Sequence, residues 1–382
     1  MDFGLTPEQQ LLRDGLAKFL GARYDLTISR AAAKEGAGWQ PEIWQAFAVD
    51  LGVLGACLPD EIGGAGGGPE ELMVVSEAVG HALVVEPFVD AIVLGARLLH
   101  RTGTPSALAL AERIGEGEAL TALAALEEAG GDRLSHVATR ADRDGDEWVV
   151  TGAKPVVLSA PLADHLIVSA RTSGAEGDRD GITLFLVDVG ETPAGLTSHE
   201  FRTVDDRRAA DLVFDGVRLP ADAAIGPIGG GLPLLERAWD EATAAVVSEA
   251  VGLMRKVFAD TVEYTKQRSQ FGQPIGSFQA LQHRMVDMYL ELEQSVAAQY
   301  LAILALDSEP AERAAAVSAA KATISRAARF IGQNAVQLHG GMGMTEELAI
   351  GHYFRRLTVI EYEFGSQDAH LARYAELSRT RD

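Results

Sequence analysis

The stretch Gln337-Leu338-His339-Gly340-Gly341-Met342-Gly343 follows a long Ala-rich segment and is the most informative part of the sequence. Before it, Ala320, Ile324, Ala327 and Ile331 recur at spacings of three and four, as on the buried face of a helix. The stretch therefore marks the end of a helix. Adjacent glycines can close a helix in the left-handed conformation, or they can let a phosphate or ribose approach the backbone. Taken alone, the glycines favour the first interpretation.

A second stretch, Arg268-Ser269-Gln270-Phe271-Gly272-Gln273-Pro274-Ile275, lies between two more segments with helical periodicity, residues 247–262 and 278–296. It combines a cation, an aromatic side chain and a flexible glycine. An arginine in this position can bind a pyrophosphate bidentately. By itself, however, the stretch is more typical of an ordinary loop between helices. Long antiparallel helices joined in this way predict a helical bundle after residue 227.

Two regions of different character precede the bundle. Residues 1–117 are predicted to be helical, and Thr6, Pro7 and Gln9 predict a capping box with proline in the first turn. Residues 118–226 instead hold short β-rich runs separated by turn residues, which predicts a small antiparallel β-domain. The expected fold class is therefore α+β, in the order helical, β, helical.

The composition narrows the function. The chain has 55 acidic and 33 basic residues and a formal net charge of -22, which argues against nucleic acid and anionic membranes as partners. No apolar run predicts a membrane span, and no signal peptide is recognisable. With Cys57 as the only cysteine, we expect a cytoplasmic protein without disulfides. We expect no metal site, because no ligand set accompanies His339 and His352.

In this order, the motifs resemble one family, the acyl-CoA dehydrogenases, over essentially the whole chain. The match includes Leu58-Pro59-Asp60-Glu61-Ile62-Gly63-Gly64 and Arg218-Leu219-Pro220 as well as the two stretches above. The resemblance implies an N-terminal helical domain (1–117), a middle antiparallel β-domain (118–226) and a C-terminal four-helix bundle (227–382). It also implies α,β-desaturation of an acyl-CoA thioester with FAD as cofactor, and an electron-transferring flavoprotein as partner.

The resemblance assigns residues to the cofactor. In this family the bundle motifs bind the FAD of a neighbouring subunit, so Arg268 and Phe271 are expected to face the adenosine pyrophosphate. The remaining residues that the match assigns to FAD are Gln279, Gln337, Leu338, Gly340, Gly341 and Ser366.

The sequence departs from the family at the catalytic base. Phe364-Gly365 replaces the usual Glu-Gly pair, and Ala242-Thr243 replaces the alternative base and its arginine. A phenyl ring cannot abstract a proton. Glu363 and Glu241 lie beside the two vacant positions. One residue rotates a helical side chain by about 100°, so Glu241 should point away, and Glu363 is the candidate base. For both, the favoured competing interpretation is a solvated surface glutamate.

The flavin-ring side is also altered. Leu126–Asp132 replaces the family's Thr-Glu-Pro loop, and Val156 and Leu158 replace a tryptophan and a threonine. These changes remove stacking and hydrogen-bonding groups. Ser159 could partly substitute for the threonine.

An intact nucleotide side beside an altered flavin side predicts a hetero-oligomer with a homologous acyl-CoA dehydrogenase subunit. The closest resemblance is to small subunits of dehydrogenases that act on pimeloyl-CoA-like or steroid side-chain CoA esters. Three alternatives stay open: a self-sufficient homotetramer that uses Glu363, a non-catalytic stabilising subunit, and a related flavin oxidase or monooxygenase.

Overall fold

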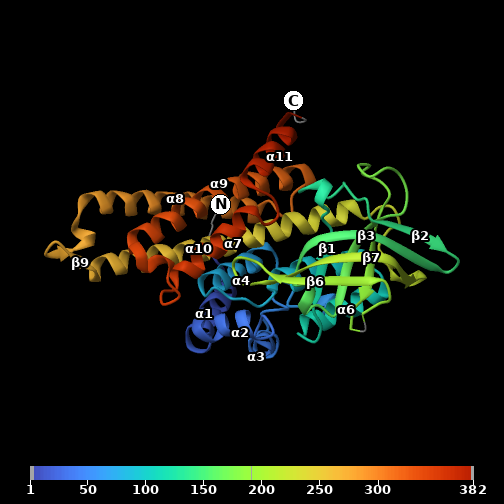
Figure 1. Ribbon diagram of the computed structural model, residues 1–382, viewed down its shortest axis with the longest axis horizontal. Helices are drawn as coiled ribbons and strands as arrows, with labels where there is room; N and C mark the ends of the chain where they lie inside the picture. Colours follow the sequence, from blue (N-terminus) through green and yellow to red (C-terminus); the bar gives the residue numbers. More distant parts are fainter. Residues whose placement is uncertain (1–3, 191, 380–382) are drawn as a thin grey trace. The chain divides into compact units, whose positions relative to one another are not determined.

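The computed structural model describes residues 4–190 and 192–379, and its elements follow the expected order of helices, strands and helices (Figure 1). The N-terminal helices are α1 (Pro7–Arg23), α2 (Leu26–Glu35), α3 (Pro41–Val49), the 3-10 helix η1 (Asp60–Ile62), α4 (Pro69–His81), the π-helix η2 (Val89–Arg97), α5 (Leu98–Thr102) and α6 (Pro105–Gly115). The predicted capping box is confirmed: the Gln9 N–H donates to the Thr6 hydroxyl at 3.2 Å, and the Thr6 N–H donates to the Gln9 side chain at 2.9 Å.

The chain folds into two compact units, each assembled from separate segments. The helical unit comprises Met1–Ile28, Pro69–Val84 and Thr243–Asp382, and the sheet unit comprises Ser29–Gly68 and Val85–Ala242. The N-terminal helices are therefore shared between the two units. The sequence did not predict this, because the contacts that group the helices join segments far apart in the chain.

The sheet unit is built around one eight-stranded sheet. Its strands are β1 (Thr121–Ala124), β2 (Arg140–Asp144), β3 (Glu147–Leu158), β4 (His165–Arg171), β5 (Ile182–Asp188), β6 (Leu196–Arg202), β7 (Arg208–Pro220) and β8 (Ala224–Ile225). The spatial order is β6-β7-β3-β2-β4-β5-β8, with β1 paired to β4. Most neighbours are antiparallel as predicted, but β1 runs parallel to β4, and β2 joins β4 through one parallel pair. The sheet is therefore mixed.

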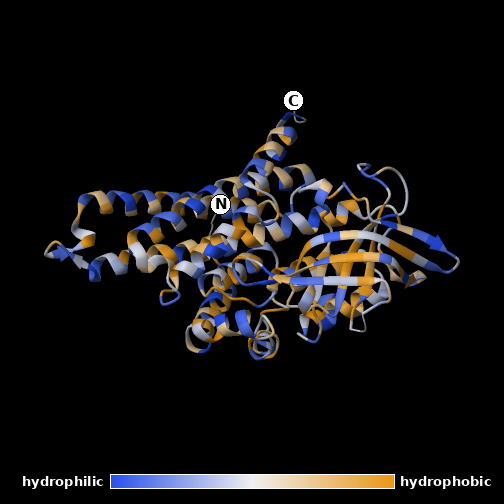
Figure 2. Cartoon of the chain, viewed as in Figure 1, coloured by the Kyte–Doolittle hydropathy of each residue, from blue (hydrophilic) through white to orange (hydrophobic). Residues whose placement is uncertain are grey.

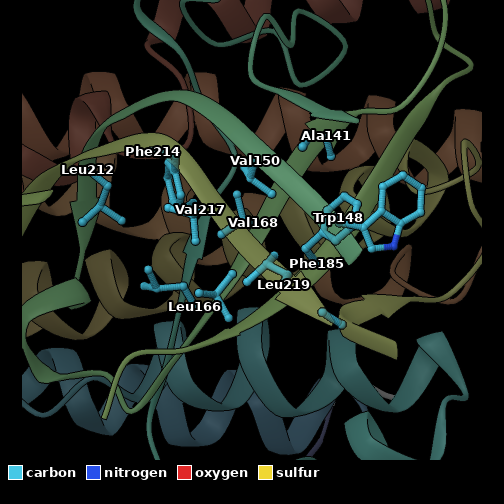
Figure 3. Close-up of a cluster of buried hydrophobic side chains, with 14 of the residues drawn as sticks. Ala141, Trp148, Val150, Leu166, Val168, Phe185, Leu212, Phe214, Val217 and Leu219 are labelled. Carbon is cyan, nitrogen blue, oxygen red and sulfur yellow. The ribbon is translucent and has the colours of Figure 1, made fainter. Parts of the chain in front are cut away.

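The sheet is held together by apolar side chains from alternate positions on its strands (Figure 3). Trp148 packs edge-on against Phe185 with ring centroids 5.3 Å apart, and Val150, Phe214 and Leu219 are buried around them. The hydrophobic colouring in Figure 2 accordingly concentrates on the central strands. Full burial of each large apolar side chain contributes roughly 1.5–3 kcal/mol.

As far as residue 379, the regular elements of the C-terminal region are helices and one short hairpin. Its elements are α7 (Leu232–Gln267), β9 (Ser269–Gln270), β10 (Gln273–Pro274), the 3-10 helix η6 (Ile275–Ser277), α8 (Gln279–Leu304), α9 (Pro310–His339), the 3-10 helix η7 (Gly340–Met344), α10 (Ile350–Tyr362) and α11 (Gln367–Arg379). Helices α8, α10 and α11 all pack on α9 (Figure 1), and the predicted stripe along α9 is fully buried. None of the described helices is long and apolar enough to cross a membrane.

Helices α4 and α7 approach each other at two glycines of the helical unit. A Cβ atom at Gly80 would lie 2.0 Å from the Glu249 carbonyl oxygen, and one at Gly252 would lie 2.0 Å from the Glu77 carbonyl oxygen. The two backbones are therefore in direct contact, which fixes the position of the α7 segment that carries Glu249.

Candidate functional site

Residues 268–275 connect α7 to α8, as the stretch predicts, and form a short β-hairpin within that connection. Gln270 pairs with Gln273, which leaves Phe271 and Gly272 as turn residues with φ of 54° and 81°. Such turns favour Asn and Gly, because positive φ strains other side chains. The Phe271 side chain is nevertheless 92% exposed, and its ring lies edge-on to Phe278 at 6.2 Å between centroids. The hairpin thus presents an aromatic ring at its tip.

The two sequence motifs meet at one cavity of the helical unit, with a volume of about 410 Å³, which we call the nucleotide cavity. Five of the residues expected at the cofactor line it: Arg268, Gln337, Leu338, Gly340 and Gly341. A neighbouring cavity of about 320 Å³ shares Gln337 and Leu338 with it and is completed by Leu281 and Arg284. Sequence motifs separated by about 60 residues are therefore brought to one place by the packing of α7, α8 and α9.

The two adjacent glycines have different roles. Gly340 ends α9 with φ of 62°, and its N–H donates to the Gln337 carbonyl, so the helix-end interpretation is correct for this residue. Gly341 has no such φ, and a Cβ atom at either glycine would meet nothing within 4 Å. Neither backbone strain nor packing requires a glycine at 341. Its exposed backbone leaves room for a ligand to approach.

One wall of the nucleotide cavity is a pair of stacked rings that the sequence did not predict. Tyr264 and His339 lie 4.2 Å apart between centroids, with planes inclined by 27°. The Nδ1–H of His339 donates to the Ala335 carbonyl at 2.8 Å, because a carbonyl can only accept. Tyr264 lies in the last turn of α7, and its carbonyl accepts from the N–H of Arg268, which follows the helix, at 2.9 Å. The ring pair is therefore next to the backbone that carries the arginine.

The arginines of the two cavities, Arg268 and Arg284, differ from other arginines of the bundle in their lack of charged partners within the described chain. Among the described residues, the guanidinium groups of Arg268 and Arg284 make no hydrogen bond or ion pair. Other arginines of the bundle have carboxylate partners, such as Arg326, which pairs with Glu291 at 3.1 Å. In a chain with net charge -22, two unpaired guanidinium groups beside adjoining cavities create a local site for an anion.

Three residues expected at the cofactor lie outside the lining of the nucleotide cavity. Phe271 is at the hairpin tip, and Gln279 is exposed at the start of α8. Ser366 caps α11, since its hydroxyl accepts from the Ala369 N–H at 3.2 Å and its carbonyl accepts from the His370 N–H at 3.1 Å. Their roles toward the cofactor stay predictions.

The vacant base position lies in a tightly pinned turn between α10 and α11. Phe364 is 8% exposed with φ of 60°. The buried Lys321 donates to the carbonyls of Ile360 and Gly365, both at 2.8 Å, and His370 Nε2 donates to the Phe364 carbonyl at 2.9 Å. Burial, assisted by the charge of Lys321, lowers the pKa of His370 to about 4. Lys321 was missed, although its position on the apolar face of α9 was a signal.

The side chain of Glu363 is buried, so the expectation of a solvated glutamate is wrong. Its side chain is 6% exposed and pairs with Arg356 Nη1 at 2.8 Å. The same guanidinium donates to both carboxylate oxygens of Glu249, at 2.7 and 2.8 Å. Arg356 was not recognised from the sequence, because one of its two carboxylate partners, Glu249, lies on α7 and is distant in the chain. The Glu363 carboxylate is committed to this triad, and its role as a base stays a prediction.

Glu241 is also buried and does not meet the expectation of a surface residue. Its carboxylate accepts hydrogen bonds from Arg101 at 2.8 and 2.6 Å, from Arg237 at 2.8 Å and from Arg97 at 3.2 Å. Burial by itself would raise the pKa of Glu241, but Arg97 and Arg101 outweigh it and lower the pKa to about 2. A carboxylate held ionised by three arginines is unsuited to accept a proton from a substrate.

In the sheet unit, the residues that replace the flavin-side groups are strained or already bonded. Val156 lies at a bulge between β3 and β7 with φ of 50°, is 56% exposed, and donates its N–H to Asp211 at 2.8 Å. Ser159 has φ of 57°, and its hydroxyl donates to Asp90 of η2 at 2.6 Å. The hydroxyl that was expected to replace a threonine is therefore occupied.

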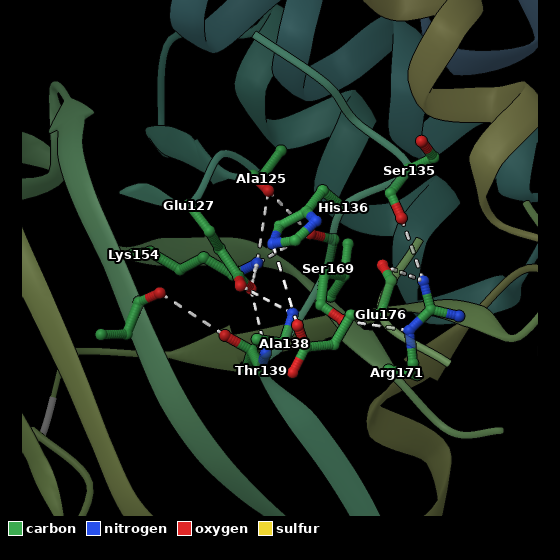
Figure 4. A network of polar contacts seen from close by, with 12 residues as sticks. Ala125, Glu127, Ser135, His136, Ala138, Thr139, Lys154, Ser169, Arg171 and Glu176 are labelled. Carbon is green, nitrogen blue, oxygen red and sulfur yellow. Dashed lines mark hydrogen bonds and ion pairs between the residues drawn. The ribbon is translucent and has the colours of Figure 1, made fainter. Parts of the chain in front are cut away.

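The loop that follows β1 is anchored by a buried ion pair (Figure 4). Lys154 Nζ donates to Glu127 at 2.7 Å and to the Ser169 hydroxyl at 3.1 Å. Glu127 also accepts the backbone N–H groups of Ala138 and Thr139, at 2.7 and 3.0 Å. Burial lowers the pKa of Lys154 to about 8. This network holds the sheet-side loop in one conformation without providing a flavin-stacking group.

Comparison with protein families gives three matches that together cover most of the chain. The model of the acyl-CoA dehydrogenase N-terminal domain matches residues 6–109, that of the middle domain residues 122–217, and that of the C-terminal domain residues 229–377.

Individual proteins agree with the family match. The probable acyl-CoA dehydrogenase YngJ of Bacillus subtilis is 28% identical over 375 residues, covering 96% of this chain and 97% of that protein. A variant of the Tcur3481-Tcur3483 steroid ACAD is 29% identical, with a TM-score of 0.87 over 98% of both chains. The ChsE4-ChsE5 complex of Mycobacterium tuberculosis contains a chain with 25% identity and a TM-score of 0.88, over 98% of both chains.

Proposed function

Because this chain belongs to the acyl-CoA dehydrogenase family of FAD-dependent oxidoreductases, we propose that it is one subunit of a hetero-oligomeric acyl-CoA dehydrogenase. In this role it supplies the nucleotide side of an FAD site, and a second, unlike family member supplies the flavin-ring side and the catalytic base. The reaction is the α,β-desaturation of an acyl-CoA thioester.

The observation that carries the proposal is the contrast between the two kinds of site residue. On the nucleotide side, Arg268 has no partner among the described residues and lines an open cavity. At the vacant base positions, Phe364 is buried, Glu363 is held by Arg356, and Glu241 is held by arginines. A binding surface that is open and a base position that is closed suit a chain that completes a partner's site.

The residues of the nucleotide cavity fit the adenosine diphosphate part of FAD. The Arg268 guanidinium matches a pyrophosphate in charge and in its fork of donors. The open backbone at Gly341 leaves space for the phosphate or ribose, and the exposed Phe271 ring offers a flat apolar surface. FAD, when bound, supplies the hydride acceptor of the reaction. The residues of this chain bind and orient the nucleotide, and they contribute no proton acceptor.

Steroid side-chain CoA esters are the substrate class that we favour. Support comes from the likeness to a steroid ACAD and to a chain of the two-protein ChsE4-ChsE5 complex. The second protein we expect in the assembly is a homologous acyl-CoA dehydrogenase subunit, and the electron acceptor an electron-transferring flavoprotein.

Flavin content tests the proposal directly. The chain should be produced alone and together with a homologous acyl-CoA dehydrogenase subunit, and flavin absorbance measured per chain. We expect almost no flavin in the isolated chain and about one flavin per pair of unlike chains. One flavin per chain in the isolated protein would contradict the shared site and favour the homotetramer with Glu363 as base. In that case Glu363→Gln should abolish activity, whereas the shared site predicts that it does not.

A further inference from the structure

Arg284 occupies a second cavity that adjoins the nucleotide cavity. The two cavities share Gln337 and Leu338, which form a common wall at the end of α9. Arg284 projects from α8, whereas Arg268 follows the end of α7. Two arginines from different elements therefore lie beside the same short segment, one in each of two neighbouring cavities.

Arg284 makes no ion pair with another residue of the described chain. Asp287 lies three residues further along α8, a spacing that often gives an ion pair, yet the two side chains make none. The residue is half-buried beside Leu281 and Leu338, where a guanidinium loses part of its hydration. Removing a charge from water without a partner is unfavourable, so this position suits an arginine whose partner is an external anion.

We propose that Arg284 is a second phosphate-binding arginine of the nucleotide site, acting with Arg268 on the pyrophosphate of a bound dinucleotide. The inference rests on the proposed function, because it assigns one more residue to the same site. Two guanidinium groups, one in each cavity, can neutralise the two negative charges of a pyrophosphate. The Gln337 amide, exposed between them, can bond to a phosphate or ribose oxygen.

The test measures binding of ADP and of adenosine to the full chain by isothermal titration calorimetry. We compare the wild type with Arg284→Gln, Arg284→Lys and Arg268→Gln. Loss of a charge-assisted contact corresponds to roughly tenfold or more in affinity. Arg284→Gln should weaken ADP binding by about that factor and leave adenosine binding unchanged. Arg284→Lys should not restore the wild-type affinity for ADP, because an ammonium lacks the planar fork of donors.

Arg326→Gln is the matched control, since it removes an exposed arginine of the same bundle that is paired with Glu291 and lines neither cavity. It should bind ADP like the wild type. If Arg284→Gln binds ADP as the wild type does while Arg268→Gln loses about tenfold, the role of Arg284 is wrong and the proposed function stands. If the wild type binds no ADP, and Arg268→Gln leaves the flavin content of the co-produced complex unchanged, then both the role of Arg284 and the proposed function are wrong. Melting temperatures establish that each variant is folded.

Discussion

At the scale of single residues, a carboxylate that lies beside a vacant base position is not automatically available as a catalytic base. Glu241 and Glu363 both lie next to such a position, yet both are buried against arginines. Removal of one member of a buried ion pair leaves an uncompensated charge, which typically costs about 3–5 kcal/mol. The ion pairs of these two glutamates therefore stabilise the fold. Because both carboxylates are held by arginines, neither is available at the vacant base positions.

His370 gives the fold a dependence on acidity. Its folded-state pKa of about 4 is below the ordinary 6.5, so the unfolded chain takes up a proton that the native state excludes. Stability should therefore fall as the pH drops from about 6.5 toward 4, by about 2–3 kcal/mol from this residue. In His370→Gln this contribution is absent. We expect the stability gap between wild type and variant to narrow by that amount between pH 7 and about pH 4.5 in urea unfolding.

His283→Gln, a change at an exposed position of α8, serves as the control. Its stability relative to the wild type should not vary with pH in the same way. A gap for His370→Gln that stays constant across the range would show that the pKa of His370 is the same in the native and unfolded states.

The Lys154–Glu127 pair should behave as a buried unit. Lys154→Met leaves the Glu127 carboxylate buried without its cation, and we expect a loss of about 3–5 kcal/mol in urea unfolding. The double variant Lys154→Met with Glu127→Gln should lose less, because no unpaired charge remains. Arg218→Gln, which breaks exposed pairs with Asp144 and Glu147, is the control and should leave stability unchanged. Equal losses in the single and double variants would contradict a coupled pair.

At the scale of elements, the close contact between the backbones of α4 and α7 requires glycine at two positions. Helices α4 and α7 touch through Gly80 and Gly252, and each lacks space for even one additional carbon. The hairpin between α7 and α8 shows the opposite situation, since Phe271 is exposed and strained without a packing reason inside the chain. Strain that persists on the surface is typical of functional sites.

Gly252→Ala should separate α4 from α7. The new Cβ atom would overlap the Glu77 carbonyl oxygen, and we expect a loss of at least about 2 kcal/mol in urea unfolding, as for overpacked cores. Gly21→Ala in α1 is the matched control, because a Cβ atom there meets nothing within 4 Å. That change should stabilise the protein by up to about 1 kcal/mol. A Gly252→Ala protein as stable as the wild type would mean that the helices can move apart freely.

At the scale of the whole molecule, the residues of the family's site are divided between the two units, and only the nucleotide cavity is open. The helical unit holds the open nucleotide cavity and the closed base position. The sheet unit holds Val156 and Ser159, which lack the flavin-side groups of the family. This distribution suits an assembly in which a chain gives more to its neighbour's cofactor than to its own.

The assembly predicts unequal effects of two substitutions on flavin content. In a complex produced with a homologous subunit, Arg268→Gln should reduce bound flavin by about tenfold or more at limiting FAD, because it removes a charged contact to the pyrophosphate. Val156→Ala, in the sheet unit, should leave flavin content unchanged, since this chain's own flavin side is not used. Absorbance per complex is the measurement. A loss of flavin in Val156→Ala would indicate that this chain holds a flavin of its own.

The sequence by itself determined the order of elements, the capping box at Thr6, the buried stripe on α9 and five residues of the nucleotide cavity. The first three follow from local rules, since helical periodicity and capping depend on residues close together in the chain. The five cavity residues follow instead from the resemblance to the acyl-CoA dehydrogenase family. The parallel pairing of β1 with β4 was not accessible in this way, because it joins strands about 40 residues apart.

Only the tertiary structure decided that Glu241 and Glu363 are buried, that Arg284 adjoins the nucleotide cavity, and that Lys321 pins the turn at Phe364. The deciding groups include residues from a different helix or a distant segment. Glu241, for example, is bound by Arg97 and Arg101, and Arg356, which pairs with Glu363 at the end of α10, also binds Glu249 of α7. The chemistry of a carboxylate or a guanidinium is set by its burial and by the charges around it, and these exist only once the chain has folded.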